Sequence, residues 1–78
     1  MNIDKELDAR GLNCPLPILR TKKTMAGLAP GEVLKVIATD PGSVKDMEAF
    51  CRQTSAQLLQ SSQDGESFLF FLKKGVNA

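Results

Sequence analysis

Two cysteines are the side chains of this chain best suited to chemistry, and one of them stands beside two prolines. Cys14 is followed by Pro15 and Pro17 in the run Gly11-Leu12-Asn13-Cys14-Pro15-Leu16-Pro17. Proline fits the first turn of a helix, because that turn needs no N–H from it and its ring already holds a helical φ. The sequence therefore places Cys14 at or beside the N-cap of a helix, where unpaired N–H groups and the helix dipole favour a thiolate.

The turn that follows Cys14 is expected to support the sulfur. Because Pro15 and Pro17 have no N–H, the nearest donors should be the N–H groups of Leu16 and Ile18, and we expect them to lower the pKa of the thiol. A rigid thiol without a partner cysteine does not readily resolve a persulfide into an internal disulfide, which suits a carrier of sulfur. The alternative is that Cys14 is a small apolar residue at a helix end.

The second cysteine is expected to be structural. Cys51 falls on an apolar stripe with Val44, Met47 and Thr54 at helical spacing, so it should face the core, where burial raises the pKa of a thiol. Phe50 is expected on the flank of this stripe. Histidine is absent, so the chain has no Cys-His pair and a poor zinc set. We expect neither a metal nor a cofactor.

Glycines and prolines divide the chain into six elements in the order βαβαββ. Alternating or apolar runs predict four strands, over residues 3–9, 32–39, 57–63 and 66–73. Helical spacing predicts one helix over 15–28 and another that begins at Val44. Ser43 and Asp46 resemble a capping box at the start of the second helix. Asp64-Gly65 predicts a hairpin with a type I′ turn.

These elements predict an α/β fold, a two-layer sandwich in a single domain over residues 1–78. Because each βαβ crossover should be right-handed, both helices are expected on one face of a four-stranded mixed sheet, whose strand order the sequence leaves open. A chain of 78 residues closes only one core. Some of Val33, Ile37, Leu69 and Phe71 should lie on the uncovered face, either as ordinary surface atoms or as a dimer contact.

The charge balance limits the classes of partner. Ten Lys and Arg against nine Asp and Glu give a net charge of +1, so no stable direct binding to nucleic acid is expected. No apolar run approaches the roughly 20 residues of a membrane span, and the first residues lack the pattern of a signal peptide. We therefore expect a cytoplasmic protein without a membrane partner.

The chain resembles the TusA-type (SirA-like) family of sulfur carriers over essentially its whole length. The resemblance rests on the run Leu7–Pro17, Lys23, Pro30-Gly31-Glu32, Asp40-Pro41 and Phe50-Cys51. It implies the same βαβαββ sandwich. It also implies that Cys14 accepts sulfane sulfur as a persulfide from a cysteine desulfurase or a rhodanese-like donor and relays it to an acceptor protein, working with partner enzymes rather than as an autonomous enzyme. Members of the family serve tRNA 2-thiouridine synthesis, molybdenum-cofactor assembly or sulfur metabolism.

A docking surface for such a donor is expected beside Cys14. Leu16, Leu19 and Lys23 share one side of the first helix by angle, and Lys22 adds a positive charge; a solvated helix face is the alternative. Two other functions remain possible. One is a non-enzymatic RNA- or protein-interaction module, since fold does not dictate function. The other is a thiol redox protein, which would need a resolving cysteine near Cys14.

Overall fold

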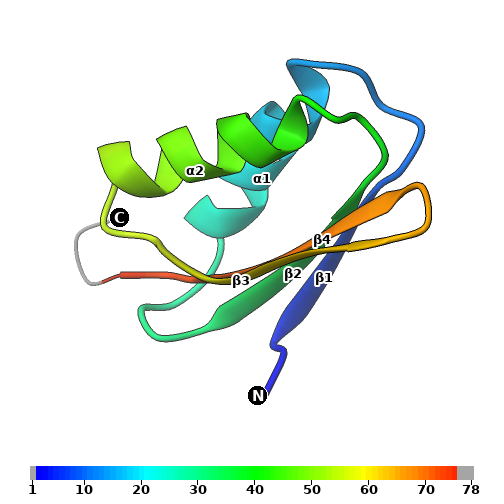
Figure 1. The fold of residues 1–78 in the computed structure, drawn as a ribbon. Helices are drawn as coiled ribbons and strands as arrows, with labels where there is room; N and C mark the ends of the chain where they lie inside the picture. The colour runs from blue at the N-terminus through cyan, green and yellow to red at the C-terminus, as the bar shows by residue number, and fades with distance from the viewer. Residues whose placement is uncertain (1, 76–78) are drawn as a thin grey trace.

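The computed structural model describes residues 2–75, which form two helices packed on one face of a sheet (Figure 1). The elements in chain order are β1 (Lys5–Ala9), α1 (Leu16–Ala26), β2 (Val33–Ala38), α2 (Ser43–Gln53), β3 (Gln57–Asp64) and β4 (Ser67–Lys73). The strand order is β1-β2-β4-β3, with β1 parallel to β2 and the other two pairs antiparallel. The predicted two-layer α/β sandwich with a mixed sheet is confirmed.

The core lies between the sheet and the two helices. Alternate residues of the two central strands point toward the helices, because side chains along a strand alternate between its faces. Fully buried side chains of these strands are Leu34, Val36, Ala38, Phe70 and Leu72. From α1, the buried Thr21 donates its hydroxyl to the Pro17 carbonyl at 2.8 Å, so the polar group is satisfied inside the core. Helix α1 is shorter than predicted, because Gly27 already forms its C-cap.

The predicted inward stripe of α2 is right in part: Met47 is fully buried, and Val44 and Cys51 pack against the core. Thr54 is exposed instead, and Phe50, expected on the flank, is buried. Ser43, Met47 and Phe50 are its buried residues, whereas Cys51 is half-buried and packs against the edge of the core. The predicted capping box is wrong. Ser43 is the first residue of the helix, and its hydroxyl has no hydrogen-bond partner among residues 2–75. The Asp46 carboxylate, which the capping box would have used, instead accepts a hydrogen bond from Cys14 in the loop before α1.

The turn between β3 and β4 differs from the predicted type. Asp64 pairs with Ser67, so the two-residue loop is Gly65-Glu66 rather than Asp64-Gly65. A type I′ turn needs positive φ at both central residues, but here only Gly65 has one, at +62°. Glycine at the first central position fits a type II′ turn instead.

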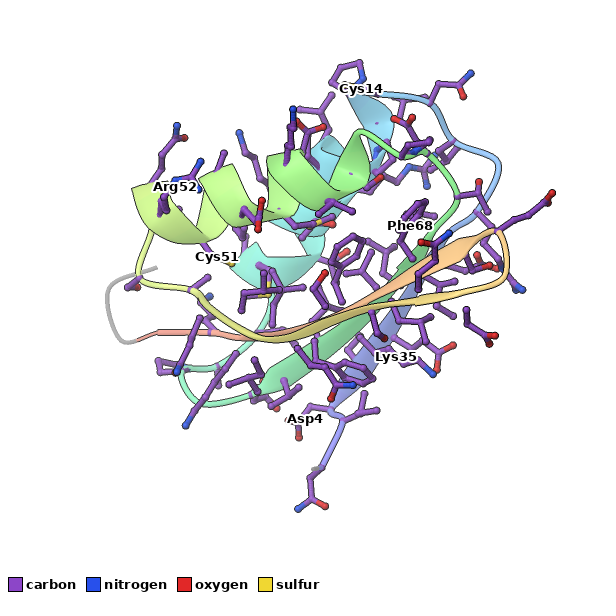
Figure 2. The ribbon with its side chains drawn as sticks, viewed as in Figure 1. Asp4, Cys14, Lys35, Cys51, Arg52 and Phe68 are labelled. Carbon is purple, nitrogen blue, oxygen red and sulfur yellow. The ribbon has the colours of Figure 1, made fainter. Side chains whose placement is uncertain are left out.

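The second face of the sheet is left uncovered by the helices. Ile37 pairs with Leu69 and Lys35 with Phe71, and none of the four belongs to the core cluster between sheet and helices. Ile37, Leu69 and Phe71 are half-buried. Figure 2 shows Lys35 on this side of the sheet, where its ammonium lies 6.0 Å from the centre of the Phe71 ring. The apolar centre of this face is thus partly shielded by a charged side chain.

Candidate functional site

Cys14 lies at the end of the molecule where both helices begin (Figure 2). The topology explains this position. Strands β1 and β2 are parallel neighbours, so the loops that follow them leave the same edge of the sheet. The first loop carries Cys14 into α1, and the second carries Asp40 into α2. The sulfur is exposed to solvent.

Two hydrogen bonds fix the loop that carries Cys14. The Gly11 N–H donates to the Thr39 hydroxyl at 2.9 Å, and the Cys14 N–H donates to Asp40 Oδ2 at 2.9 Å. Gly11 has a φ of +81°, a conformation that favours glycine. The other carboxylate oxygen of Asp40 accepts from the Gly42 N–H at 3.4 Å. Asp40 therefore joins both loops at the position of the thiol.

Replacing Asp40 by Ala should loosen this loop. The N–H of Cys14 would lose its charged acceptor, and the free energy of unfolding should fall by about 1 kcal/mol. Urea denaturation measures the effect, with Glu48→Ala as the control, because Glu48 is an exposed acid on α2. An equal loss in the two variants would show that the Asp40 contact does not stabilise the loop.

The environment of the sulfur differs from the prediction. Cys14 Sγ donates to Asp46 Oδ2 at 3.4 Å. This hydrogen bond raises the pKa of the Cys14 thiol, and partial desolvation and the negative charges of Asp46 and Asp40 raise it further. The predicted lowering of the pKa is wrong for the free protein. The Leu16 N–H, expected near the sulfur, instead donates to the Asn13 carbonyl at 2.8 Å.

The turn after Cys14 is anchored by only part of the predicted set. Pro15 occupies the N-cap, with φ −97° and ψ 15°, so the helix begins at Leu16 and Cys14 precedes the cap. Pro17 is buried and Ile18 half-buried, whereas Pro15 and Leu16 are exposed. Pro17 and Ile18 are therefore the residues that pack the first turn of α1 into the protein.

Cys51 is separated from this site along α2. Asp46, which contacts Cys14, lies in the first turn of the helix, and Cys51 lies more than one turn beyond it. Burial raises the pKa of the Cys51 thiol. Both cysteines are free thiols, and Figure 2 shows them at different ends of the helical layer.

The predicted docking residues fall on two different surfaces. Leu16 and Leu19 are 45% and 50% exposed, and together with Arg20 and Lys23 they line a shallow hollow. Lys22 does not line it. It lies on the side of α1 that faces α2, in a hollow shared with Asp46.

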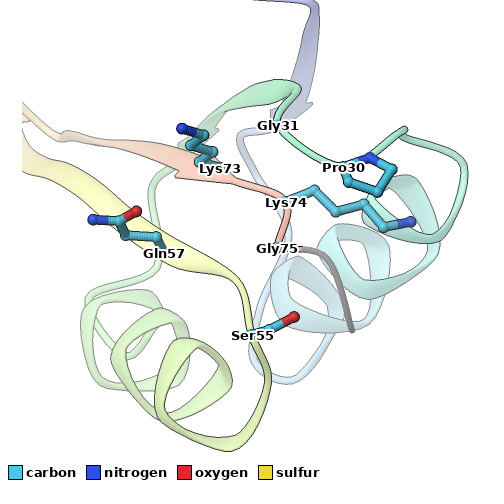
Figure 3. Close-up of a pocket in the computed structure, with 7 residues that line it drawn as sticks. All are labelled: Pro30, Gly31, Ser55, Gln57, Lys73, Lys74 and Gly75. Carbon is cyan, nitrogen blue, oxygen red and sulfur yellow. The ribbon is translucent and has the colours of Figure 1, made fainter.

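Another hollow lies where β3 begins and β4 ends, beside the loop before β2 (Figure 3). Its lining residues are Pro30, Gly31, Ser55, Gln57, Lys73, Lys74 and Gly75. Backbone groups here are already paired, since the Gly31 N–H donates to the Lys74 carbonyl and the Lys74 N–H to the Glu32 carbonyl. None of the described residues that line this hollow is a cysteine or an acid, so they offer no thiol chemistry.

The described part of the chain shows neither a metal-ligating set nor a membrane helix. Over residues 2–75, no three His, Cys, Asp or Glu side chains come together as a set that could hold a metal ion. Neither of the two helices described is long and apolar enough to span a bilayer.

Sequence reasoning missed the two carboxylates of the site. From the sequence, Asp40 has no assigned role of its own, and Asp46 has only the local role of a capping box. The signal that could have found them is topological. Two parallel strands side by side bring the ends of their following loops together, and both aspartates lie in or just after the second loop.

A family model and two similar proteins all point to the same family. A family model described as sulfurtransferase TusA matches residues 5–74. The sulfur carrier protein TusA of Allochromatium vinosum is 59% identical over 73 residues, covering 94% of this chain and 96% of that protein. The sulfur carrier protein TusA of a Pseudomonas putida strain is 44% identical over 71 residues, covering 91% and 89%.

A solved structure supports the fold independently. The crystal structure of a SirA-like protein from Desulfitobacterium hafniense matches with a TM-score of 0.70 and 24% identity, covering 91% of this chain and 97% of that chain. At this level of identity the match concerns the fold alone. The family model and the two relatives show that the chain belongs to the TusA family of sulfur-carrier proteins.

Proposed function

We propose that this chain carries sulfur as a persulfide on Cys14 and passes it to the thiolate of an acceptor protein. The observation that carries the proposal is the placement of Cys14. Its sulfur is exposed, its backbone N–H is fixed by Asp40, and the second thiol, Cys51, lies on another part of the fold. An exposed sulfur without a resolving cysteine suits transfer between proteins better than disulfide exchange within one.

The chemistry requires two displacements at sulfur. In loading, the Cys14 thiolate attacks the outer sulfur of a persulfide on a cysteine desulfurase or a rhodanese-like donor; the S–S bond of the donor breaks, and its cysteine leaves as a thiolate. In unloading, an acceptor thiolate attacks the outer sulfur on Cys14, which leaves in turn as a thiolate. The oxidation level of the transferred sulfur is unchanged, so no external oxidant or reductant is needed.

The donor docks, we propose, on the hollow beside Cys14. Leu16 and Leu19 supply exposed apolar area, and Arg20 and Lys23 supply positive charge at its rim. Exposed leucines next to a reactive sulfur are suited to exclude water from a transient contact. The acidic counterpart of this surface would lie on the donor.

Replacing Leu19 by Ala should slow sulfur loading without changing the fold. Leu19 is half exposed, so its removal costs little packing, but it takes apolar contact from the docking hollow. We expect the second-order rate constant of loading to fall by about tenfold. Leu59→Ala is the matched control, because Leu59 is an exposed leucine on β3. An equal effect of the two substitutions would contradict this docking surface.

The downstream acceptor belongs to the same proposal. Transfer in tRNA 2-thiouridine synthesis, molybdenum-cofactor assembly or another route of sulfur metabolism would require a thiol-bearing acceptor protein. A net charge of +1 supports contact with proteins rather than direct binding of tRNA. Free thiols at both cysteines suit a reducing compartment such as the cytoplasm.

The test is to form the persulfide with a sulfur donor and to measure the mass of the protein. The reduced chain is incubated with a cysteine desulfurase, pyridoxal phosphate and cysteine, and its intact mass is measured without reductant. We expect the mass of one added sulfur atom, and we expect dithiothreitol to remove it. No adduct with this donor and none with a rhodanese would overturn the proposal.

A further inference from the structure

Asp46 on α2 reaches the sulfur of Cys14, which lies in the loop before α1. Its Oδ2 accepts from Sγ at 3.4 Å, and the residue is half-buried in the first turn of α2. A carboxylate in this position keeps the proton on the sulfur, because a thiolate would stand directly against a negative charge. This arrangement is the opposite of the electropositive surroundings that activate most nucleophilic cysteines.

The two carboxylates near the thiol have no ion-pair partner among residues 2–75. Asp40 adds a second carboxylate, which binds the backbone N–H of Cys14 at 2.9 Å. Among residues 2–75, the one ion pair joins Arg10 and Asp8, so neither Asp40 nor Asp46 has a cationic partner there. One positively charged side chain of α1, Lys22, lines the same hollow as Asp46. Lys22 is not within ion-pair distance of Asp46, so the Asp46 carboxylate stays available to a cation from a partner.

We propose that Asp46 is a positioning residue that holds the proton on Cys14 in the free protein, and that a sulfur donor makes the thiol reactive by presenting a Lys or Arg side chain to Asp46. The inference rests on the proposed carrier function. The hollow between α1 and α2 is open at the surface and is lined by Asp46, Ile18 and Ala49 among others, so a side chain of a partner can enter it.

In the complex, the donor cation acts on Cys14 through Asp46. It pairs with the Asp46 carboxylate, which then no longer opposes a negative charge on sulfur. Cys14 releases its proton to solvent, and the resulting thiolate attacks the outer sulfur of the donor persulfide. The S–S bond of the donor breaks, and the departing donor thiolate takes up a proton. A carrier of this kind is unreactive in solution and reactive in the complex with its donor.

The first experiment measures the free thiol and needs no sulfur transfer. The rate of alkylation of Cys14 by iodoacetamide is followed against pH for the native chain, Asp46→Asn and the control Glu48→Gln, which removes the same charge from an exposed position of α2. Tryptic peptides separate Cys14 from Cys51, because Arg20 and other cleavage sites lie between them.

The Asn variant should move the midpoint of the profile to lower pH. If the midpoint falls by about one pH unit, the thiolate fraction near neutral pH rises about tenfold. The alkylation rate should then rise only about threefold, because a thiolate of lower pKa is a weaker nucleophile. Glu48→Gln should match the native profile. A midpoint unchanged in Asp46→Asn would overturn the role of Asp46. Asp46→Ser, with a hydroxyl that helix N-termini also accept, repeats the test if the Asn variant does not fold.

The second experiment measures loading by a persulfidated cysteine desulfurase. Although its free thiol is more reactive, Asp46→Asn should load about tenfold more slowly than the native chain, because the donor cation has lost its carboxylate. Loading as fast as, or faster than, the native chain would overturn the donor contact. If the native chain itself does not load, the carrier function fails, while the alkylation profiles still decide whether Asp46 holds the proton.

Discussion

Replacing Cys14 by Ser should abolish sulfur loading while leaving the fold nearly unchanged. A serine hydroxyl cannot form a persulfide, but it is only slightly smaller than the thiol and can still donate to Asp46. Because the side chain is exposed, we expect the free energy of unfolding to change by less than about 0.5 kcal/mol. Intact mass after incubation with a desulfurase measures loading, and urea denaturation measures stability.

Cys51→Ser is the matched control, and it should behave in the opposite way. Cys51 is half-buried against the core, so a hydroxyl there should cost about 1 kcal/mol while loading continues. A folded Cys51→Ser protein that no longer accepts sulfur would remove Cys14 from its assigned role.

Replacing Phe70 by Ala should produce the largest loss of stability. Phe70 is fully buried and lies on the helix-facing side of β4, so its removal leaves a cavity in the middle of the core. Phenylalanine to alanine in such a position costs about 3–5 kcal/mol, a large part of the total for a small domain. The midpoint of urea denaturation, analysed at constant slope, measures the loss.

The neighbouring Phe71 provides the control for this substitution. It projects from the opposite face of the same strand, is half-buried, and pairs with Lys35 across β2. Phe71→Ala should therefore cost clearly less than Phe70→Ala, because less apolar area leaves contact with protein. Equal losses of stability in the two variants would contradict the register, which places Phe70 on the core face of β4 and Phe71 on the opposite face.

The order and type of the elements could be predicted because they depend on local signals. The apolar run around Val36 and the hairpin around Gly65 each specify a strand or turn within a few residues. On α2 the predicted stripe identified Met47, but it placed Cys51 rather than Phe50 among the most buried residues, because neighbouring positions on a helix differ in direction by only part of a turn.

The reactive cysteine could be found from the sequence, but its chemical environment could not. Prolines beside Cys14 predict a helix start, and this prediction needs only local backbone geometry. The acidic partners of Cys14 come from residues 26 and 32 positions away in the sequence, Asp40 and Asp46. Their approach depends on β1 and β2 being parallel neighbours, and the sequence left the strand order open.

The raised pKa of Cys14 changes how the carrier is expected to work. A helix N-terminus alone would predict a thiolate ready to react at neutral pH. The contact with Asp46 predicts a protonated thiol that waits for its donor. Under the proposed function, the unloaded thiol would then react little with other electrophiles until a donor binds.

The most direct test of the carrier function is a peptide map of the loaded protein. After incubation with a cysteine desulfurase, pyridoxal phosphate and cysteine, the chain is digested without reductant and each cysteine peptide is weighed. One additional sulfur atom on the peptide that contains Cys14, removed by dithiothreitol, is the predicted result. Sulfur found on the Cys51 peptide, or on neither peptide, would contradict it.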